Sequence, residues 1–147
     1  RSILEKCKRR NIEPNVQSIQ NTLTDIAGIR VICSYVEDIY AIGEYLIKQE
    51  DVELLRKSDY IKNPKQNGYR SLHLIVQVPL FLTEETVKIP VEIQLRTEAM
   101  DFWASLEHDL HYKTNKHIPS DLVIELKECA DTLANLDLKM QEIKNKI

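Results

Sequence analysis

A chain of 147 residues is long enough for one domain with a real core and too short for two domains of ordinary size. Its net charge of −3 argues against an extended nucleic-acid-binding face, and its apolar runs are too short to span a bilayer. Three cysteines without a CxxC pair argue against a disulfide scaffold and favour a reducing, cytoplasmic setting.

Two short segments concentrate positive charge. Residues 1–10 and residues 56–70 each contain five basic side chains and one acidic side chain. Surface charge exposed to solvent explains either segment taken alone. Together, two small basic segments in an acidic chain suit a compact polyanion such as a nucleotide.

The predicted elements begin with a short basic helix. Ser2 and Glu5 form a capping box, in which two side chains satisfy free backbone groups at a helix start. A β-rich run over residues 26–33 then predicts a central strand. Ser34 and Glu37 form a second capping box, and the apolar residues that follow recur at helical spacing.

The middle of the chain predicts three more strands. A weaker strand covers about residues 52–57, and residues 63–68 form a loop because they contain proline, asparagine and glycine. Residues 71–78 and 88–95 have the composition of two strands, and a helix follows over about 97–112. This order predicts an α+β domain with a mixed β-sheet flanked by helices, and we expect about five strands in the whole sheet.

The last predicted helix begins near Ser120 and continues to the C-terminus. Its apolar residues alternate between spacings of four and three, the a/d pattern of a coiled coil: Leu122, Leu126, Cys129, Leu133, Leu136, Met140, Ile143 and Ile147. This seam packs either on the preceding helix or on a partner chain. Because the helix would be roughly 40 Å long, we expect a homo-oligomer, with residues 1–118 as one domain and 119–147 as an oligomerisation helix.

Strand alternation separates polar from apolar residues. Glu92, Gln94 and Arg96 lie on one face of their strand, opposite the apolar residues between them. Tyr69 and His73 share one face at the start of the preceding strand. These faces are either washed by solvent or form a platform for a polar ligand.

Two carboxylates from different strands suggest a cation site. Asp25 immediately precedes the strand at 26–33, and Glu92 lies on the polar face of the strand at 88–95. Alone, Asp25 is more often a turn residue, but with Glu92 it predicts the Mg²⁺ site that phosphoryl transfer requires. Within the same strand, Gly28 permits close approach to the backbone, and Arg30 needs an anionic or aromatic partner.

Two further features suit phosphate binding. The helix that begins at Ser2 offers free backbone N–H groups, and Lys6 and Arg9 lie along it. The loop at 63–68 supplies Lys65, and Tyr69 follows it with an aromatic plane that can stack on a base.

His108 and His111 are three residues apart and raise the possibility of zinc. No cysteine lies near them and the order is not HExxH, so a charged helix explains them better.

Four motifs occur together in one order: Asp-Ile-Ala-Gly-Ile-Arg-Val at 25–31, Asn-Gly-Tyr-Arg-Ser-Leu-His at 67–73, Val-Glu-Ile-Gln-Leu-Arg-Thr at 91–97, and Phe-Trp-Ala at 102–104 with Glu-His at 107–108. This set, which extends along almost the whole chain, closely resembles the synthetase domain of the RelA/SpoT family. It is far more specific than any single motif. The resemblance implies a nucleotidyltransferase-like fold, with the synthetase domain over residues 1–118.

The resemblance also implies roles for individual residues. Asp25 matches a Mg²⁺-binding aspartate, and Glu92 matches a catalytic glutamate that helps to hold the metal and deprotonates a hydroxyl. Tyr69 matches a tyrosine that stacks on guanine. Lys65 and His73 match groups that contact the phosphates of the guanine nucleotide.

The remaining matches concern Gln94 and the ATP site. Gln94 lies in the same strand motif as the catalytic glutamate and is assigned to the guanine nucleotide. Arg30 matches an arginine that packs on adenine. Ser2, Lys6 and Arg9 match the end of the motif that binds the ATP phosphates.

As a whole, the resemblance implies a small stand-alone bacterial alarmone synthetase, an enzyme of the stringent response. Such an enzyme moves pyrophosphate from ATP to the ribose 3′-hydroxyl of GDP or GTP, uses Mg²⁺, and is typically a cytoplasmic homotetramer. Two alternatives are a guanine-nucleotide sensor without activity and a toxin-like relative that modifies RNA 3′ ends.

Three departures from the family pattern concern the substrates. The ATP motif normally begins a few residues earlier, with an Arg and a Lys. Ser58 stands where bifunctional relatives have Lys, and Asp101 stands where some small relatives have Asn near the guanine. The last two leave the choice between GDP and GTP open.

Overall fold

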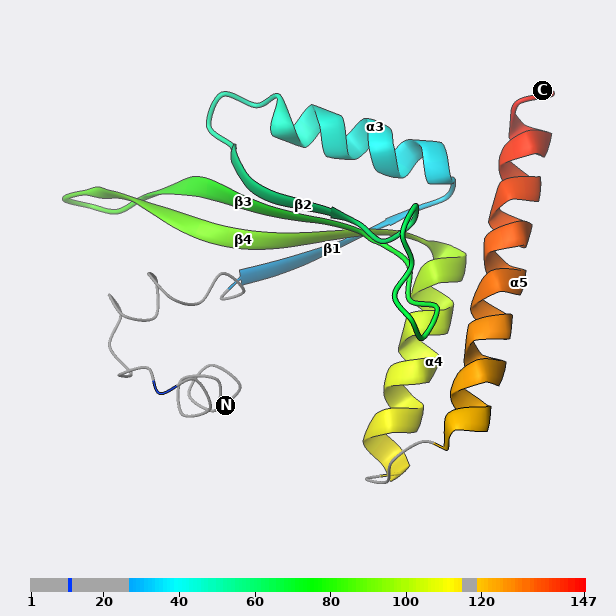
Figure 1. Cartoon of the computed structure of the whole chain (residues 1–147). Coiled ribbons are helices and arrows are strands. Elements are labelled where there is room, and N and C mark those ends of the chain that lie inside the picture. Colours follow the sequence, from blue (N-terminus) through cyan, green and yellow to red (C-terminus); the bar gives the residue numbers. More distant parts are fainter. Residues whose placement is uncertain (1–10, 12–26, 115–118) are drawn as a thin grey trace.

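The computed structural model describes Asn11 and residues 27–114 and 119–147 (Figure 1). Four strands form one mixed sheet in the order β1-β4-β3-β2: β1 (Ala27–Cys33), β2 (Glu53–Asp59), β3 (Leu72–Phe81) and β4 (Thr86–Thr97). β1 pairs with β4 in parallel, and the other two pairings are antiparallel. The α+β class and all four predicted strand segments are confirmed. The described residues contain four strands, one fewer than the count of about five.

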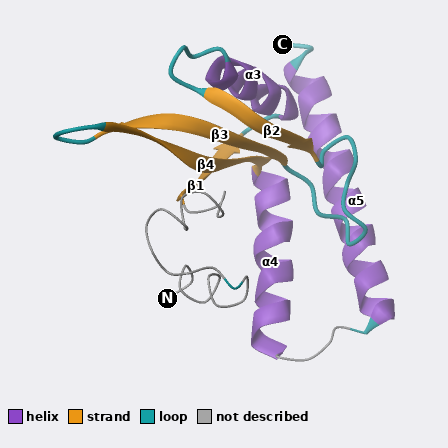
Figure 2. Cartoon of the chain, turned by 60° about the vertical axis from the view of Figure 1, so that its left-hand side comes forward, coloured by secondary structure: helices purple, strands orange, loops and turns teal. Residues whose placement is uncertain are grey.

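Three helices accompany the sheet in the described part of the chain: α3 (Val36–Ile47), α4 (Glu98–Thr114) and α5 (Ser120–Lys144). α3 lies over one face of the sheet, α4 leaves the end of β4, and α5 runs beside α4 and on towards α3 (Figures 1 and 2). None of the helices in this described part is both long and apolar enough to cross a membrane.

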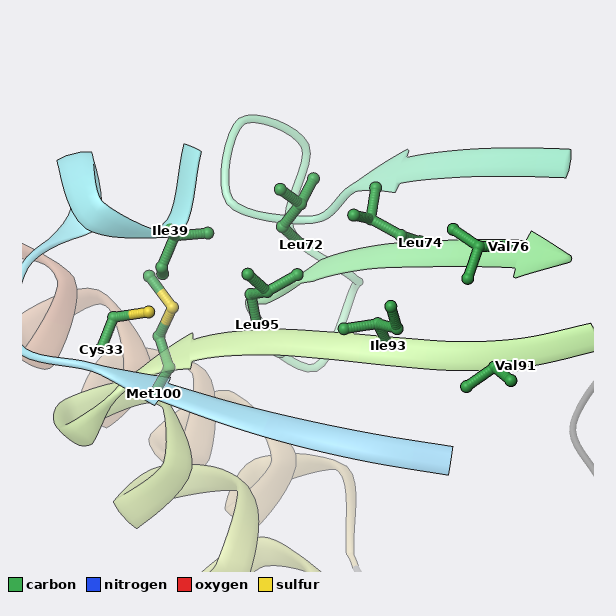
Figure 3. Close-up of a cluster of buried hydrophobic side chains, with 9 residues drawn as sticks. All are labelled: Cys33, Ile39, Leu72, Leu74, Val76, Val91, Ile93, Leu95 and Met100. Carbon is green, nitrogen blue, oxygen red and sulfur yellow. The ribbon is translucent and has the colours of Figure 1, made fainter. Parts of the chain in front are cut away.

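The main core fills the space between α3 and the sheet (Figure 3). β3 and β4 each contribute every second side chain to it, because successive side chains of a strand point to opposite faces, and β1 adds Cys33. Its buried members are Cys33, Ile39, Leu72, Leu74, Val76, Val91, Ile93, Leu95 and Met100. The opposite face of the same strands is therefore free to carry polar residues.

The predicted start of α3 is wrong by one residue. The helix begins at Val36, so Tyr35 is the capping residue, and its backbone N–H donates to Asp38 Oδ2 at 3.2 Å. Glu37 does not serve this role, because its backbone and carboxylate bond to Gln141 of α5.

A second, smaller core joins α4 to α5. Trp103, Ala104 and Ala130 are buried there, and the indole Nε1–H of Trp103 donates to the Leu126 carbonyl at 2.7 Å. Thr97 starts α4, since its Oγ1 accepts the Met100 N–H at 3.1 Å, as a helix N-cap does.

The apolar seam of α5 is divided between the interior and solvent. Leu126 and Leu133 are half-buried and pack on the smaller core, together with Ala130. Four other members are between 44% and 50% exposed: Leu122, Leu136, Met140 and Ile143. The helix ends at Lys144, three residues before the C-terminus.

Candidate functional site

Polar side chains from neighbouring strands lie in rows across the face opposite α3. The strand register aligns Arg30 with Gln94, Gln94 with His73, and His73 with Ser58. In the next row Gly28 is aligned with Glu92. The predicted polar platform is therefore formed by several strands together, as alternation within single strands indicated.

The Tyr69 hydroxyl is the centre of a hydrogen-bond network on this face. It accepts hydrogen bonds from Arg96 Nη2 at 2.8 Å and from Ser71 Oγ at 3.0 Å. His73 Nε2 lies 2.8 Å from the same oxygen. Because a phenol has one hydrogen and already accepts twice, it donates that hydrogen to His73 Nε2.

This arrangement determines the tautomer of His73 and engages Glu92. With Nε2 accepting, the neutral ring carries its hydrogen on Nδ1, which lies 3.1 Å from Glu92 Oε1. One carboxylate oxygen of Glu92 thus accepts from His73, and the chain Tyr69–His73–Glu92 fixes the carboxylate in place. The Glu92 side chain keeps 25% of its surface exposed.

The charge state of His73 agrees with this tautomer. Burial is the largest influence and lowers the pKa of His73, whereas Glu92 raises it. The nearby basic side chains lower the pKa further: Lys65, Arg96 and Arg56. His73 is therefore neutral at neutral pH.

The loop before β3 holds Lys65 and Tyr69 together. Lys65 Nζ lies 5.0 Å from the centre of the Tyr69 ring, and the Gly68 N–H donates to the Lys65 carbonyl at 2.8 Å. Gly68 has a φ of +95°, and a β-carbon there would come within 2.7 Å of the Ala130 side chain. Only glycine fits a positive φ and so close a contact, so α5 determines where this loop lies.

A salt bridge ties the same loop to α5. Arg70 Nη2 donates to Asp131 Oδ1 at 2.7 Å, and the Arg70 side chain is only 15% exposed. Asn67 Nδ2 also donates to Glu107 Oε1 of α4, at 3.3 Å. Both helices therefore support the position of Tyr69.

Arg96 connects the polar strand to α4. Its side chain is 6% exposed, Nη2 donates to Gln94 Oε1 at 3.0 Å, and Nη1 donates to Asp101 Oδ1 at 3.0 Å. Its guanidinium carbon also lies 5.2 Å from the centre of the Tyr69 ring. Sequence reasoning placed Arg96 on the polar face without a role. The signal was a charged residue in a buried strand, which needs partners.

Two hollows adjoin on this side of the molecule. The larger, of about 440 Å³, is lined by Arg30, Tyr69, Arg96 and α4 residues between Ala104 and Asp109. The smaller, of about 220 Å³, is lined by Gly28, Arg30, Glu92 and Gln94 among others. Arg30 lines both hollows, and it therefore links the one that contains the Tyr69 ring to the one that contains the Glu92 carboxylate.

The structure brings together six of the predicted site residues: Arg30, Lys65, Tyr69, His73, Glu92 and Gln94. The other four lie outside the described residues: Ser2, Lys6, Arg9 and Asp25. The second carboxylate of the predicted Mg²⁺ pair is among these four.

The alternative metal site on α4 gains no support. His111 Nε2 lies 2.8 Å from Glu107 Oε1, one turn away on the same helix. Within residues 27–114 and 119–147, no group of three or more His, Cys, Asp or Glu side chains is arranged to hold a metal ion.

Comparison with known proteins identifies the family. The model of the region found in RelA/SpoT proteins matches residues 1–117. The chain belongs to the RelA/SpoT family. Among curated relatives, GTP pyrophosphokinase YwaC of Bacillus subtilis is 46% identical, with 99% of this chain and 70% of the relative covered. GTP pyrophosphokinase YjbM of the same organism is 40% identical, with 99% and 68% covered.

Solved structures place this RelA/SpoT chain among the small alarmone synthetases. Small alarmone synthetase 2 of Bacillus subtilis has a TM-score of 0.88 and 45% identity, with 99% of this chain and 76% of the other covered. Small alarmone synthetase 1 of that organism, bound to its product pppGpp, has a TM-score of 0.86 and 39% identity, with 99% and 74% covered. These similarities in sequence and in structure confirm the family resemblance that the motifs indicated.

Proposed function

We propose that this RelA/SpoT chain transfers pyrophosphate from ATP to the ribose 3′-hydroxyl of GDP or GTP, with AMP and (p)ppGpp as products in the stringent response. The observation that carries the proposal is the pair of adjoining hollows, one with the Tyr69 ring and the other with the Glu92 carboxylate. An aromatic plane suits a nucleobase, and a carboxylate beside it suits activation of a hydroxyl. The relatives named GTP pyrophosphokinase support the same reaction.

The acceptor nucleotide would bind through the Tyr69 loop. The guanine base stacks on the Tyr69 ring, and Lys65, 5.0 Å from the ring centre, contacts the 5′-phosphates. His73 lines the same site without donating to a phosphate, because Tyr69 and Glu92 already engage both of its ring nitrogens. Gln94 lies next to Glu92 on the same strand face and contacts the acceptor. The hydrogen bonds of the Tyr69 hydroxyl hold the ring in place before the nucleotide binds, so binding costs little conformational entropy at this side chain.

Glu92 would act as the general base. Its Oε1 is engaged by His73 at 3.1 Å, which leaves Oε2 to accept the proton of the ribose 3′-hydroxyl. The 3′-oxygen then forms a bond to the β-phosphorus of ATP. The bond between that phosphorus and the α–β bridging oxygen breaks, and AMP leaves with the oxygen. Alignment of the two nucleotides supplies most of the rate.

The donor site and the metal complete the proposal. Glu92 lines a hollow open to solvent and offers the hard oxygen ligand that Mg²⁺ prefers. Gly28 is aligned with Glu92 in the sheet, and Asp25 precedes Gly28 by only three residues in the sequence. We assign Asp25 and Glu92 to a Mg²⁺ ion, which offsets charge on the transferring phosphates when bound. Arg30 packs on adenine, and Ser2, Lys6 and Arg9 contact the ATP phosphates.

A transfer assay tests the reaction directly. The full-length protein is mixed with Mg²⁺, GDP or GTP, and ATP labelled in the β-phosphate, and nucleotides are separated by anion exchange. We expect label in guanosine tetra- or pentaphosphate together with AMP. Guanine-nucleotide binding without any product would favour a sensor, and transfer of label to tRNA alone would favour the RNA-modifying class.

We also propose that the protein is a homo-oligomer, a tetramer in the simplest case, and acts in the cytoplasm. The support is the α5 seam, because four of its heptad residues stay 44–50% exposed after the helix has packed on its own domain. An a/d repeat packs against another helix with the same repeat, so we expect a second copy of the chain to cover these residues. The division into residues 1–118 and 119–147 remains a proposal, in which the last helix both supports the loop and joins copies.

The double variant Leu136→Glu/Met140→Glu tests the oligomer. Two carboxylates on the seam should reduce the mass measured by light scattering to that of a smaller assembly, while the circular dichroism spectrum is retained. Lys139→Glu is the matched control, because it changes the net charge by the same −2 at an exposed position off the seam. A monomeric wild type, or an unchanged mass in the double variant, would contradict the proposal.

A further inference from the structure

One carboxylate oxygen on α4 meets arginines from two different strands. Asp101 Oδ1 accepts from Arg96 Nη1 at 3.0 Å and lies 3.5 Å from Arg30 Nη1. Arg96 belongs to β4 and Arg30 to β1, and the register places neither directly opposite the other. Asp101 is therefore the group that joins the two guanidinium groups.

The two arginines serve different parts of the site. Arg96 donates to the Tyr69 hydroxyl at 2.8 Å and lies over the Tyr69 ring, so it belongs to the guanine platform. Arg30 borders both hollows and is assigned to adenine under the proposed function. The chain of contacts from Tyr69 through Arg96 and Asp101 to Arg30 thus extends from one base site to the other.

The two arginine side chains that contact Asp101 differ in how firmly they are held. The Arg96 side chain is 6% exposed and makes hydrogen bonds to three partners: Tyr69, Gln94 and Asp101. The Arg30 side chain is 53% exposed, and its contact with Asp101 is longer. An exposed ion pair of this kind restrains a side chain only weakly. In the free protein, the Arg30 side chain is therefore restrained less than the Arg96 side chain.

We propose that Asp101 is a positioning residue that couples the two nucleotide sites, so that each nucleotide increases the affinity for the other. Guanine stacked on Tyr69 excludes water from the Arg96–Asp101 pair, which strengthens the hold of Asp101 on Arg30. The Arg30 side chain is then already ordered when adenine binds. Adenine binding therefore does not bear the entropy cost of ordering Arg30, and its affinity increases. By thermodynamic linkage, adenine must tighten guanine binding by the same factor.

This coupling gives the enzyme an advantage specific to a two-substrate transfer. A carboxylate between two arginines favours the ternary complex over either binary complex, and transfer occurs only in the ternary complex. The inference rests on the proposed function, because it takes the adenine and guanine assignments of Arg30 and Tyr69 from it.

Titration calorimetry tests the coupling without turnover. A non-hydrolysable ATP analogue, with a methylene group between the α- and β-phosphates, is titrated into the full-length protein with Mg²⁺, with and without saturating GDP. We expect GDP to lower the Kd of the analogue about fivefold or more, near the low end of couplings between two sites. The reverse titration, GDP with and without the analogue, should give the same factor.

Asp101→Asn removes the charge and keeps the shape of the side chain. We expect the coupling factor to fall below about twofold, while each nucleotide alone still binds. Glu98→Gln is the matched control, since it removes a carboxylate that is exposed in the first turn of the same helix, and it should keep the wild-type factor. A purely structural role of Asp101 would weaken both affinities and leave the factor unchanged.

Two results would overturn the inference: a wild-type factor near one, or a wild-type factor retained in Asp101→Asn. The transfer assay separates these from failure of the proposed function. Product formation without coupling would refute only the role of Asp101, whereas absence of product and of analogue binding would refute both.

Discussion

The two faces of the sheet are built from alternate residues of the same strands and are stabilised in different ways. In β4, Ile93 and Leu95 are buried against α3, while Glu92 and Gln94 lie on the opposite face. The first face depends on buried apolar area and the second on hydrogen bonds between specific atoms. A change on one face should therefore affect stability and a change on the other should affect chemistry.

The largest expected effect comes from Glu92→Gln on the polar face. Amide for carboxylate keeps the shape but removes the base, so kcat should fall about 10²- to 10⁴-fold, while the free energy of unfolding changes by less than about 1 kcal/mol. Transfer assays and urea unfolding measure both quantities. Glu53→Gln is the matched control, because Glu53 is exposed and pairs only with Lys88 among its described contacts. Wild-type kcat in Glu92→Gln would remove Glu92 from the proposed mechanism.

The apolar face should respond in the opposite way. Leu74 is fully buried in the main core, so Leu74→Ala should cost about 2–5 kcal/mol of unfolding free energy through lost burial and a cavity. The KM values of the folded fraction should stay close to wild type. Leu80→Ala on the same strand, where the side chain is 43% exposed, should cost much less. Equal losses in both variants would contradict the assignment of the core.

Gly68→Ala tests how α5 supports the polar face. A β-carbon at positive φ costs about 1–2 kcal/mol, and contact with Ala130 adds to this cost, so both stability and guanine-nucleotide affinity should fall. Gly28→Ala is the control for stability, because its β-carbon would meet only ordinary contact, 3.9 Å from the Glu92 carbonyl. A fully stable Gly68→Ala protein with unchanged affinity would show that the loop does not depend on α5.

The smallest expected effect is a pH dependence from Asp137. Burial raises the pKa of Asp137, so the folded state binds its proton more tightly than the unfolded state. Its contribution to stability is therefore lost as pH rises from about 4 through the higher folded pKa. Asp137→Asn, which can still accept from Thr97, should be more stable than wild type at pH 7 by less than about 1 kcal/mol because solvent screens the charge.

Asp131 provides the contrast for that measurement. The Arg70 hydrogen bond lowers the pKa of Asp131, so its contribution is present at neutral pH and lost on acidification. Unfolding midpoints are therefore measured from about pH 2 to about pH 7, because Asp131 titrates below about pH 4 and Asp137 above it. Relative to wild type, Asp137→Asn should gain stability towards neutral pH and Asp131→Asn should lose it. The same trend in both variants would contradict the two assignments.

The division of the sheet into two faces could be predicted from the sequence. Alternation predicted which residues of β3 and β4 point away from the core, and helical spacing predicted α3, α4 and α5 within a few residues at their ends. These patterns are local, because the period of two in a strand and 3.6 in a helix depends on the backbone alone. Motifs in the right order were enough to predict the family.

Tertiary structure decided the contacts between segments far apart in the chain. No pattern near Arg70 indicates that it pairs with Asp131, 61 residues away. Likewise, no pattern near Arg96 indicates that it donates to Tyr69, 27 residues away. The seam of α5 reads as one uniform repeat, yet only part of it is buried, because packing against α4 uses one side of the helix. Sequence by itself determined the elements and the candidate residues. Strand register and helix packing decided which side chains meet, since those distances depend on the whole fold.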